Sequence, residues 1–155
     1  MEGEHPNKLT PGFGTHLTPK RSINIKQLKE QKDKIIPLNH ILKNEITVWA
    51  SVPSVISRFM HMFGQKEIKT NINIMFLCGE PFKLDVMDYC FQKLKLKNVY
   101  NFYGLTETGV ENFYYKCQPR DREKYHRHGM LPIGKVLPGN NAMISDEKEL
   151  MISGY

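Results

Sequence analysis

The sequence predicts an α/β fold, a partial three-layer arrangement of a sheet with flanking helices, followed by a few antiparallel strands at the C-terminal end. Apolar runs of strand length at residues 46–50 and 72–77 alternate with segments of helical period. The segment that follows each of these two runs is long enough for a crossover helix, as parallel strands require. Two short strands separated by Asp146 and Glu147 at a turn account for the antiparallel part.

An arm, a polar segment and a short helix are predicted before the first strand. Residues 1–13 contain turn formers and few apolar side chains, which predicts a flexible arm, and a single, partial domain is expected over residues 14–155. Residues 23–32 are polar, which predicts an exposed helix or an irregular segment. Residues 37–44 predict a short helix with an apolar inner side made by Leu38, Ile41 and Leu42.

The strand at residues 46–50 leads into a second helix, with Ser51 as its expected N-cap and Pro53 near its start. The apolar residues of this helix recur at helical spacing, and they are Val55, Ile56, Phe59, Met60 and Phe63.

A strand, a helix and a further strand are predicted between residues 72 and 103. The helix spans residues 83–94 and carries Val86, Cys90, Phe91 and Leu94 on one face. Such a unit is normally a right-handed parallel crossover, so the loops after both strands emerge at the same edge of the sheet. A strand at residues 110–117, a charged loop, and strands near residues 142–145 and 149–153 complete the chain.

The stretch Asn-Phe-Tyr-Gly-Leu-Thr-Glu-Thr at residues 101–108 has the chemistry needed to hold a nucleotide and its metal. Tyr103 can stack on a base, and Gly104 lets the backbone approach a phosphate. Thr106 can donate to a phosphate oxygen, and Glu107 is a hard oxygen ligand for Mg²⁺. The alternative is an ordinary strand end in which Thr106 caps a short helix.

The ordered motifs resemble those of the adenylate-forming enzymes, and most closely the amino-acid adenylation domains similar to D-alanine carrier-protein ligase. Residues 101–108 resemble the family's Asn-x-Tyr-Gly-x-Thr-Glu signature, with leucine where peptide synthetases favour proline. Cys-Gly-Glu-Pro at residues 78–81 resembles its adenine-side loop, and residues 132–139 its Pro-Ile-Gly-x-x-x-Pro-Gly element. Residues 14–20 and 46–54 match more loosely.

The resemblance implies an enzyme that condenses a carboxylate with ATP to an acyl-adenylate, with release of pyrophosphate from ATP, and then passes the acyl group to a thiol. It implies Mg²⁺ at Glu107 and the walls of a small amino-acid or acyl pocket at Cys78 and Val110. One face of adenine would lie against Gly79, Glu80 and Pro81, and the other against Tyr103. The nucleotide as a whole would contact Asn101, Phe102, Tyr103, Gly104, Leu105 and Thr106.

Several parts that the family uses are missing from these 155 residues. These 155 residues contain no Gly-, Ser- and Thr-rich phosphate loop ending in lysine, no ribose-binding aspartate motif, and no C-terminal subdomain with its lysine. The chain is therefore expected to be a middle portion of an adenylation domain that is inactive alone, since such parts position the phosphates. A carrier protein or a complementing chain is the expected partner. The alternative is a noncatalytic remnant or a protein-interaction module.

Composition favours a cytoplasmic protein without a membrane span. No apolar run approaches ~18 residues, and three cysteines form neither a disulfide framework nor a metal pattern. The net charge of +6 is concentrated partly in residues 120–127, which also contain two acids, so nucleic-acid binding is the weaker interpretation. A metal site made by Cys117, His126 and His128 is a further, weaker alternative because it lacks a recognised zinc spacing.

Overall fold

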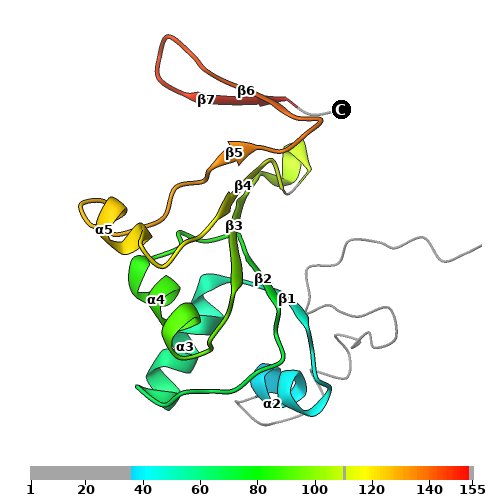
Figure 1. Ribbon diagram of the computed structural model, residues 1–155. Coiled ribbons are helices and arrows are strands. Elements are labelled where there is room, and N and C mark those ends of the chain that lie inside the picture. The colour runs from blue at the N-terminus through cyan, green and yellow to red at the C-terminus, as the bar shows by residue number, and fades with distance from the viewer. Residues whose placement is uncertain (1–35, 110, 154–155) are drawn as a thin grey trace, which may run out of the picture.

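The structure is a computed structural model, and it describes residues 36–109 and 111–153. The predicted arm at residues 1–13, the polar segment at 23–32 and Val110 lie outside the described residues. Figure 1 shows the described chain as a sheet with helices beside it and a separate hairpin at the C-terminal end.

Five strands form the main sheet in the order of the chain. The first three pair in parallel, and the fourth and fifth add in antiparallel orientation. The strand-helix-strand unit predicted between residues 72 and 103 is therefore confirmed as a parallel crossover. The strands are β1 (Val48–Ser51), β2 (Ile74–Leu77), β3 (Asn98–Tyr103), β4 (Phe113–Lys116) and β5 (Lys135–Val136).

Helices α3 (Pro53–Phe63) and α4 (Leu84–Gln92) lie together on one face of this sheet (Figure 1). Their apolar sides meet the buried strand residues Trp49, Met75 and Val99 in one core. Alternate strand residues point to opposite faces, so the other face carries half-buried side chains such as those of Phe76 and Tyr100. The shorter helices are α2 (Ile36–Lys43), the 3₁₀ turn η1 (Thr106–Thr108) and α5 (Asp121–Tyr125).

Three local predictions were wrong. Ser51 is the last residue of β1, and the N-cap of α3 is Val52, which has no capping side chain. Leu42 is 43% exposed, because the buried side of α2 is set by Leu38 and Ile41 at a spacing of three residues. The strand predicted at residues 110–117 spans only Phe113–Lys116, since the described residues Glu111 and Asn112 before it and Cys117 after it are not part of a strand.

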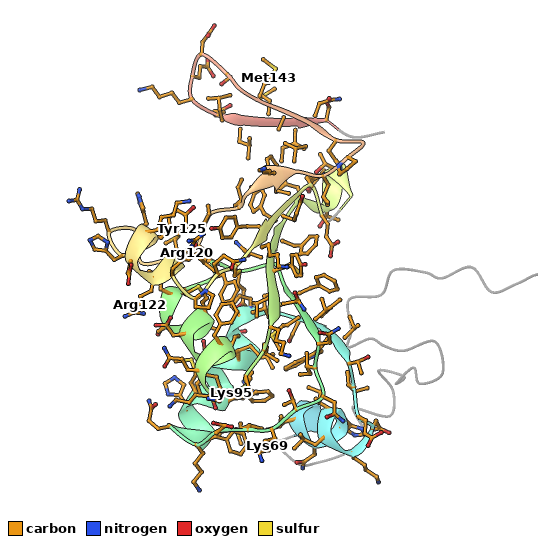
Figure 2. All side chains as sticks on the ribbon, viewed as in Figure 1. Lys69, Lys95, Arg120, Arg122, Tyr125 and Met143 are labelled. Atoms are coloured by element: carbon orange, nitrogen blue, oxygen red, sulfur yellow. The ribbon has the colours of Figure 1, made fainter. Side chains whose placement is uncertain are left out.

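The two C-terminal strands were predicted correctly and form a hairpin of their own. They are β6 (Asn141–Ile144) and β7 (Leu150–Ser153), paired in antiparallel orientation as a separate two-stranded sheet. Met143, labelled in Figure 2, is 66% exposed on this hairpin. Within the described ranges, none of the helices has the length and apolarity needed to cross a membrane.

Candidate functional site

A cavity of about 270 Å³ opens where β2 and β3 end. Parallel strands place the loops after their carboxyl ends at one edge of the sheet, and α/β folds bind ligands at that edge. The structure brings the two predicted loops together here. The lining residues are Gly79, Glu80, Pro81, Phe82, Asn101, Phe102, Tyr103, Gly104, Met130, Leu131 and Ile133.

The third wall of this cavity comes from a segment far along the chain. The backbone N–H of Leu131 donates to the carbonyl of Phe82 at 2.8 Å, which lays residues 129–131 beside the loop after β2. The Asn101 amide donates from Nδ2 to the carbonyl of Pro132 at 2.9 Å. The sequence analysis did not identify Met130, Leu131 and Ile133 as cavity walls. Ile133 belongs to the Pro-Ile-Gly element, which could have pointed to this segment.

Strand alternation separates the two aromatic residues at the end of β3. The Phe102 ring packs against Phe76 at 5.3 Å and Tyr114 at 6.4 Å between ring centroids, on the sheet face away from α3 and α4. The Tyr103 ring is half-buried and meets the edge of Phe113 at 5.9 Å. Tyr103 is therefore the aromatic side chain on the opposite face of the strand end.

The remaining signature residues lie beyond the cavity lining, on the turn that follows β3. Leu105, Thr106 and Glu107 are exposed, and the last two belong to η1. The alternative role of Thr106 as a cap is wrong, since Leu105 is the N-cap and makes no side-chain capping bond. An exposed carboxylate on a turn beside the cavity suits Mg²⁺, which usually keeps several waters and takes only one or two protein carboxylates.

Cys78 is buried at the end of β2, and Val110, its predicted partner in a substrate pocket, lies outside the described residues. Burial raises the pKa of the Cys78 thiol, and the charge of Glu111 raises it further. Burial also raises the pKa of the Glu111 carboxyl. The Cys78 thiol is therefore protonated at neutral pH, which suits a pocket wall better than a nucleophile.

Glu80 has a structural contact that sequence reasoning missed. Its carboxylate accepts from the backbone N–H of Ser54 at 2.8 Å and from the Ser54 hydroxyl at 2.8 Å. Ser54 lies in the first turn of α3, where unpaired backbone N–H groups and the helix dipole favour a negative charge. The Glu80 side chain thus joins the cavity loop to the start of α3.

Replacing Glu80 with alanine is expected to destabilise the fold by about 0.5–2 kcal/mol, the usual cost of losing a helix cap. Urea denaturation followed by circular dichroism measures this change. Glu147→Ala, which removes an exposed carboxylate from the β6–β7 turn, is the matched control. Equal midpoints for the two variants would contradict the capping role.

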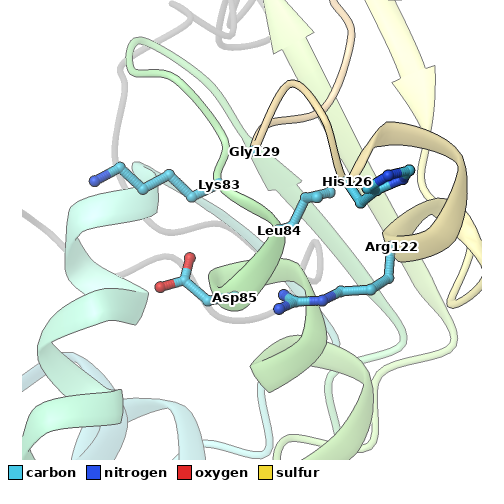
Figure 3. A pocket seen from close by; sticks show the side chains of 6 residues that line it. All are labelled: Lys83, Leu84, Asp85, Arg122, His126 and Gly129. Carbon is cyan, nitrogen blue, oxygen red and sulfur yellow. The ribbon is translucent and has the colours of Figure 1, made fainter.

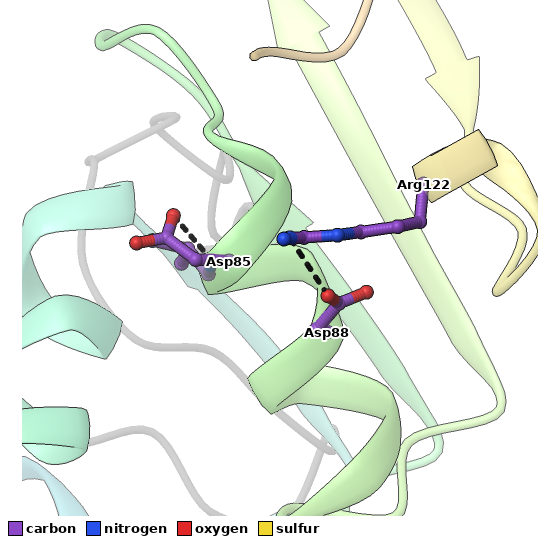
Figure 4. A network of polar contacts seen from close by, with 4 residues as sticks. Asp85, Asp88 and Arg122 are labelled. Carbon is purple, nitrogen blue, oxygen red and sulfur yellow. Dashed lines mark hydrogen bonds and ion pairs between the residues drawn. The ribbon is translucent and has the colours of Figure 1, made fainter. Parts of the chain in front are cut away.

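A second cavity, of about 370 Å³, lies between the start of α4 and the region of α5, and Figure 3 shows its lining. Arg122 pairs with Asp88 at 2.9 Å (Figure 4), and Nδ1 of His126 lies 2.7 Å from the carbonyl oxygen of Glu123. Burial raises the pKa of the Asp88 carboxyl, although Arg122 opposes this rise. Lys83 points away from Arg122 and His126 (Figure 3). The basic side chains here do not converge on one point.

The metal alternative at Cys117 finds no geometric support. Cys117 is buried, and burial is the main cause that raises the pKa of its thiol to about 12. Among the residues that the structure describes, no three or more His, Cys, Asp or Glu side chains are grouped so that they could hold a metal ion.

Comparison with known proteins gives consistent matches over most of the chain. The family model described as AMP-binding enzyme matches residues 24–154. The D-alanine–D-alanyl carrier protein ligase of Staphylococcus haemolyticus is 31% identical over 148 residues, which are 94% of this chain and 28% of the ligase. The chain therefore spans less than a third of the length of this curated relative.

Solved structures share the fold. The Vibrio cholerae adenylation domain AlmE, in complex with glycyl-adenosine-5'-phosphate, matches with a TM-score of 0.60 and 26% identity, covering 76% of this chain and 22% of that one. The O-succinylbenzoate coenzyme A synthetase of Bacillus subtilis, in complex with ATP and magnesium ion, matches with a TM-score of 0.56 and 20% identity, covering 76% and 24%. The predicted fold class is confirmed.

Proposed function

Since this chain belongs to the AMP-binding enzyme family, we propose that it supplies the adenine-binding part of an amino-acid or acyl adenylating ligase. Such a ligase converts a carboxylate and ATP to an acyl-adenylate with release of pyrophosphate, and then transfers the acyl group to a thiol. The observation that carries the proposal is the shared cavity, in which residues 79–82 and 101–104 meet at the carboxyl edge of parallel strands.

The cavity suits one part of a nucleotide. Its volume of about 270 Å³ lies just below the range of about 300–1,000 Å³ for complete small-molecule pockets. Phe82, Leu131 and Tyr103 provide apolar and aromatic surface for a base, and Gly79 and Gly104 leave the backbone accessible. In this proposal adenine lies between residues 79–81 and Tyr103, and Thr106 donates to a phosphate oxygen.

Mg²⁺ would bind at Glu107, where it would neutralise phosphate charge. Glu107 offers an exposed carboxylate on η1, and the phosphates and water would complete the coordination.

The proposed acyl donor is a small amino acid, and the proposed acceptor is a carrier-protein thiol. The similarity to a D-alanine–D-alanyl carrier protein ligase supports both, and the glycyl-adenylate bound to AlmE supports a small side chain. Buried Cys78 next to the cavity loop is suited to close off a small pocket.

Calorimetric titration of the folded chain tests the proposal. The chain is titrated with ATP and Mg²⁺ and then with AMP, and circular dichroism confirms that it is folded. Saturable binding of both nucleotides is expected, because both contain the adenosine that the cavity would hold. Absence of binding heat from both nucleotides across several temperatures would contradict the proposal.

Replacing Glu107 with glutamine is expected to remove most of the Mg²⁺ dependence of ATP binding, since the amide loses the charge that attracts the ion. The measurement is the ATP dissociation constant with Mg²⁺ and with EDTA. Glu149→Gln, a change at an exposed carboxylate of the C-terminal region, is the control. Unchanged Mg²⁺ dependence in Glu107→Gln would remove Glu107 from the metal site.

A further inference from the structure

Asn112 is a fully buried polar residue at the end of the turn that carries Thr106 and Glu107. Its side chain has 0% exposure, and no motif of the sequence drew attention to it. It precedes β4 directly and therefore lies where the chain returns to the sheet. A buried amide of this kind must be hydrogen-bonded, so its partners indicate what it holds in place.

The Asn112 amide uses all of its hydrogen-bonding capacity. Oδ1 accepts from the backbone N–H of Leu105 at 3.2 Å and from the Thr108 hydroxyl at 2.7 Å. Nδ2 donates to the carbonyl of Thr108 at 2.8 Å and to Oδ1 of Asn140 at 2.8 Å. An asparagine amide offers two donors and an oxygen with two lone pairs, and all four positions are filled.

The backbone of Asn112 also forms hydrogen bonds with β3 and with the segment that contains Asn140. Its N–H donates to the carbonyl of Tyr103 at 2.8 Å, and its carbonyl accepts from the N–H of Leu137 at 2.8 Å. One residue therefore joins the end of β3, both ends of η1 and the segment 137–140. The partners on the turn, Leu105 and Thr108, immediately flank Thr106 and Glu107.

The geometry points to Asn112 as the positioning residue of the metal-nucleotide site, an inference that rests on the proposed function. Thr106 and Glu107 lie on an exposed turn of three residues, whose own hydrogen bonds include a long one of 3.5 Å from the Gly109 N–H to the Thr106 carbonyl. Asn112 holds the backbone on both sides of that pair from the buried side. Functional side chains need such support to keep a productive geometry.

The proposed site has two parts, and only one of them is held by the Asn112 side chain. The Asn112 side chain does not line the cavity, and its hydrogen-bond partners Leu105, Thr108 and Asn140 are not lining residues, although Leu105 directly follows Gly104. Loss of the amide should therefore affect the turn, with its phosphate and metal contacts, more than the base cavity. Binding of ATP with Mg²⁺ and binding of AMP without metal report on these two parts separately.

The experiment measures both affinities by calorimetry for the wild-type chain and for Asn112→Leu. Leucine keeps the approximate size of the side chain but removes all four hydrogen bonds of the side-chain amide. An increase of about tenfold in the dissociation constant for ATP with Mg²⁺ is expected, the lower end of the effect typical for residues that orient metal ligands. The dissociation constant for AMP is expected to change by less than about threefold, since the base cavity keeps its walls.

Asn98→Leu is the matched control. Asn98 lies at the opposite end of β3. Its side-chain amide donates to the backbone carbonyl of Asn73 at 3.1 Å and to the side-chain oxygen of Asn73 at 3.3 Å. The control loses asparagine hydrogen bonds far from the turn, so it should change both affinities by the same small factor.

Thr108→Val covers the case in which Asn112→Leu does not fold, because it removes only the hydroxyl that donates to Asn112 at 2.7 Å. A smaller loss in the same direction, again selective for ATP with Mg²⁺, is expected. Equal losses for both nucleotides, or no loss in the folded variants, would overturn the positioning role alone. A folded wild-type chain that binds neither nucleotide would overturn the proposed function, and this inference with it.

Discussion

Alanine at position 134 is expected to destabilise the fold by about 2–5 kcal/mol. Gly134 has φ +90°, a region that costs an ordinary residue about 1–2 kcal/mol. A Cβ atom there would also lie 2.6 Å from the carbonyl carbon of Tyr114 and 2.8 Å from Cα of Tyr115. These neighbours are backbone atoms of a paired strand, so they yield only by shifting the sheet, an overpacking cost of about 1–3 kcal/mol.

Gly129→Ala separates the two costs. Gly129 has φ +70°, but nothing lies within 4 Å of the position its Cβ would take. The control should therefore show the backbone cost without the collision. Thermal and urea unfolding of both variants give the comparison, and equal destabilisation would show that β4 accommodates the extra atom.

The Gly134 substitution should also disturb the candidate site. Gly134 follows Pro132, whose carbonyl accepts from Asn101, and Ile133, which lines the cavity. A displacement of β5 from β4 would move this wall. Nucleotide binding by Gly134→Ala is accordingly expected to weaken even at temperatures where the variant remains folded, as calorimetry can measure.

Replacing Tyr103 with alanine is expected to weaken the binding of ATP and of AMP by about 1–3 kcal/mol, the usual cost of losing an aromatic side chain stacked on a base. The effect should be similar for both nucleotides, because the base is common to them. This distinguishes Tyr103 from Glu107, whose replacement should affect only the binding that depends on Mg²⁺. Calorimetric dissociation constants with both ligands provide the test.

Tyr100→Ala is the matched control for Tyr103. Tyr100 is a half-buried tyrosine of the same strand, but its ring packs with Phe76 at 5.7 Å on the other face of the sheet. It should lose stability through packing without a selective loss of nucleotide affinity. If Tyr103→Ala and Tyr100→Ala bind nucleotides equally well, the stacking role of Tyr103 is wrong.

The apolar patterning of the sequence was sufficient to predict the first three strands of the sheet and the parallel crossover between residues 72 and 103. The runs that became β1, β2 and β3 alternate with a helical pattern, and both are local signals that follow from backbone geometry. The predicted loops at residues 78–81 and 101–104 meet because parallel strands end at one edge. Sequence reasoning was less accurate at Ser51 and Leu42, where strand and helix ends depend on their neighbours.

Local patterns in the chain were therefore enough to predict the fold class, the family and the two loops of the candidate site. The contacts that support these loops are visible only in the folded chain, because they are long-range hydrogen bonds. Glu80 bonds to Ser54 across 26 residues, Asn101 to Pro132 across 31, and Asn112 to Asn140 across 28. A polar side chain has the same local pattern whether it binds a ligand, caps a distant helix or supports a turn. Its role depends on which long-range partner satisfies its hydrogen bonds once it is buried.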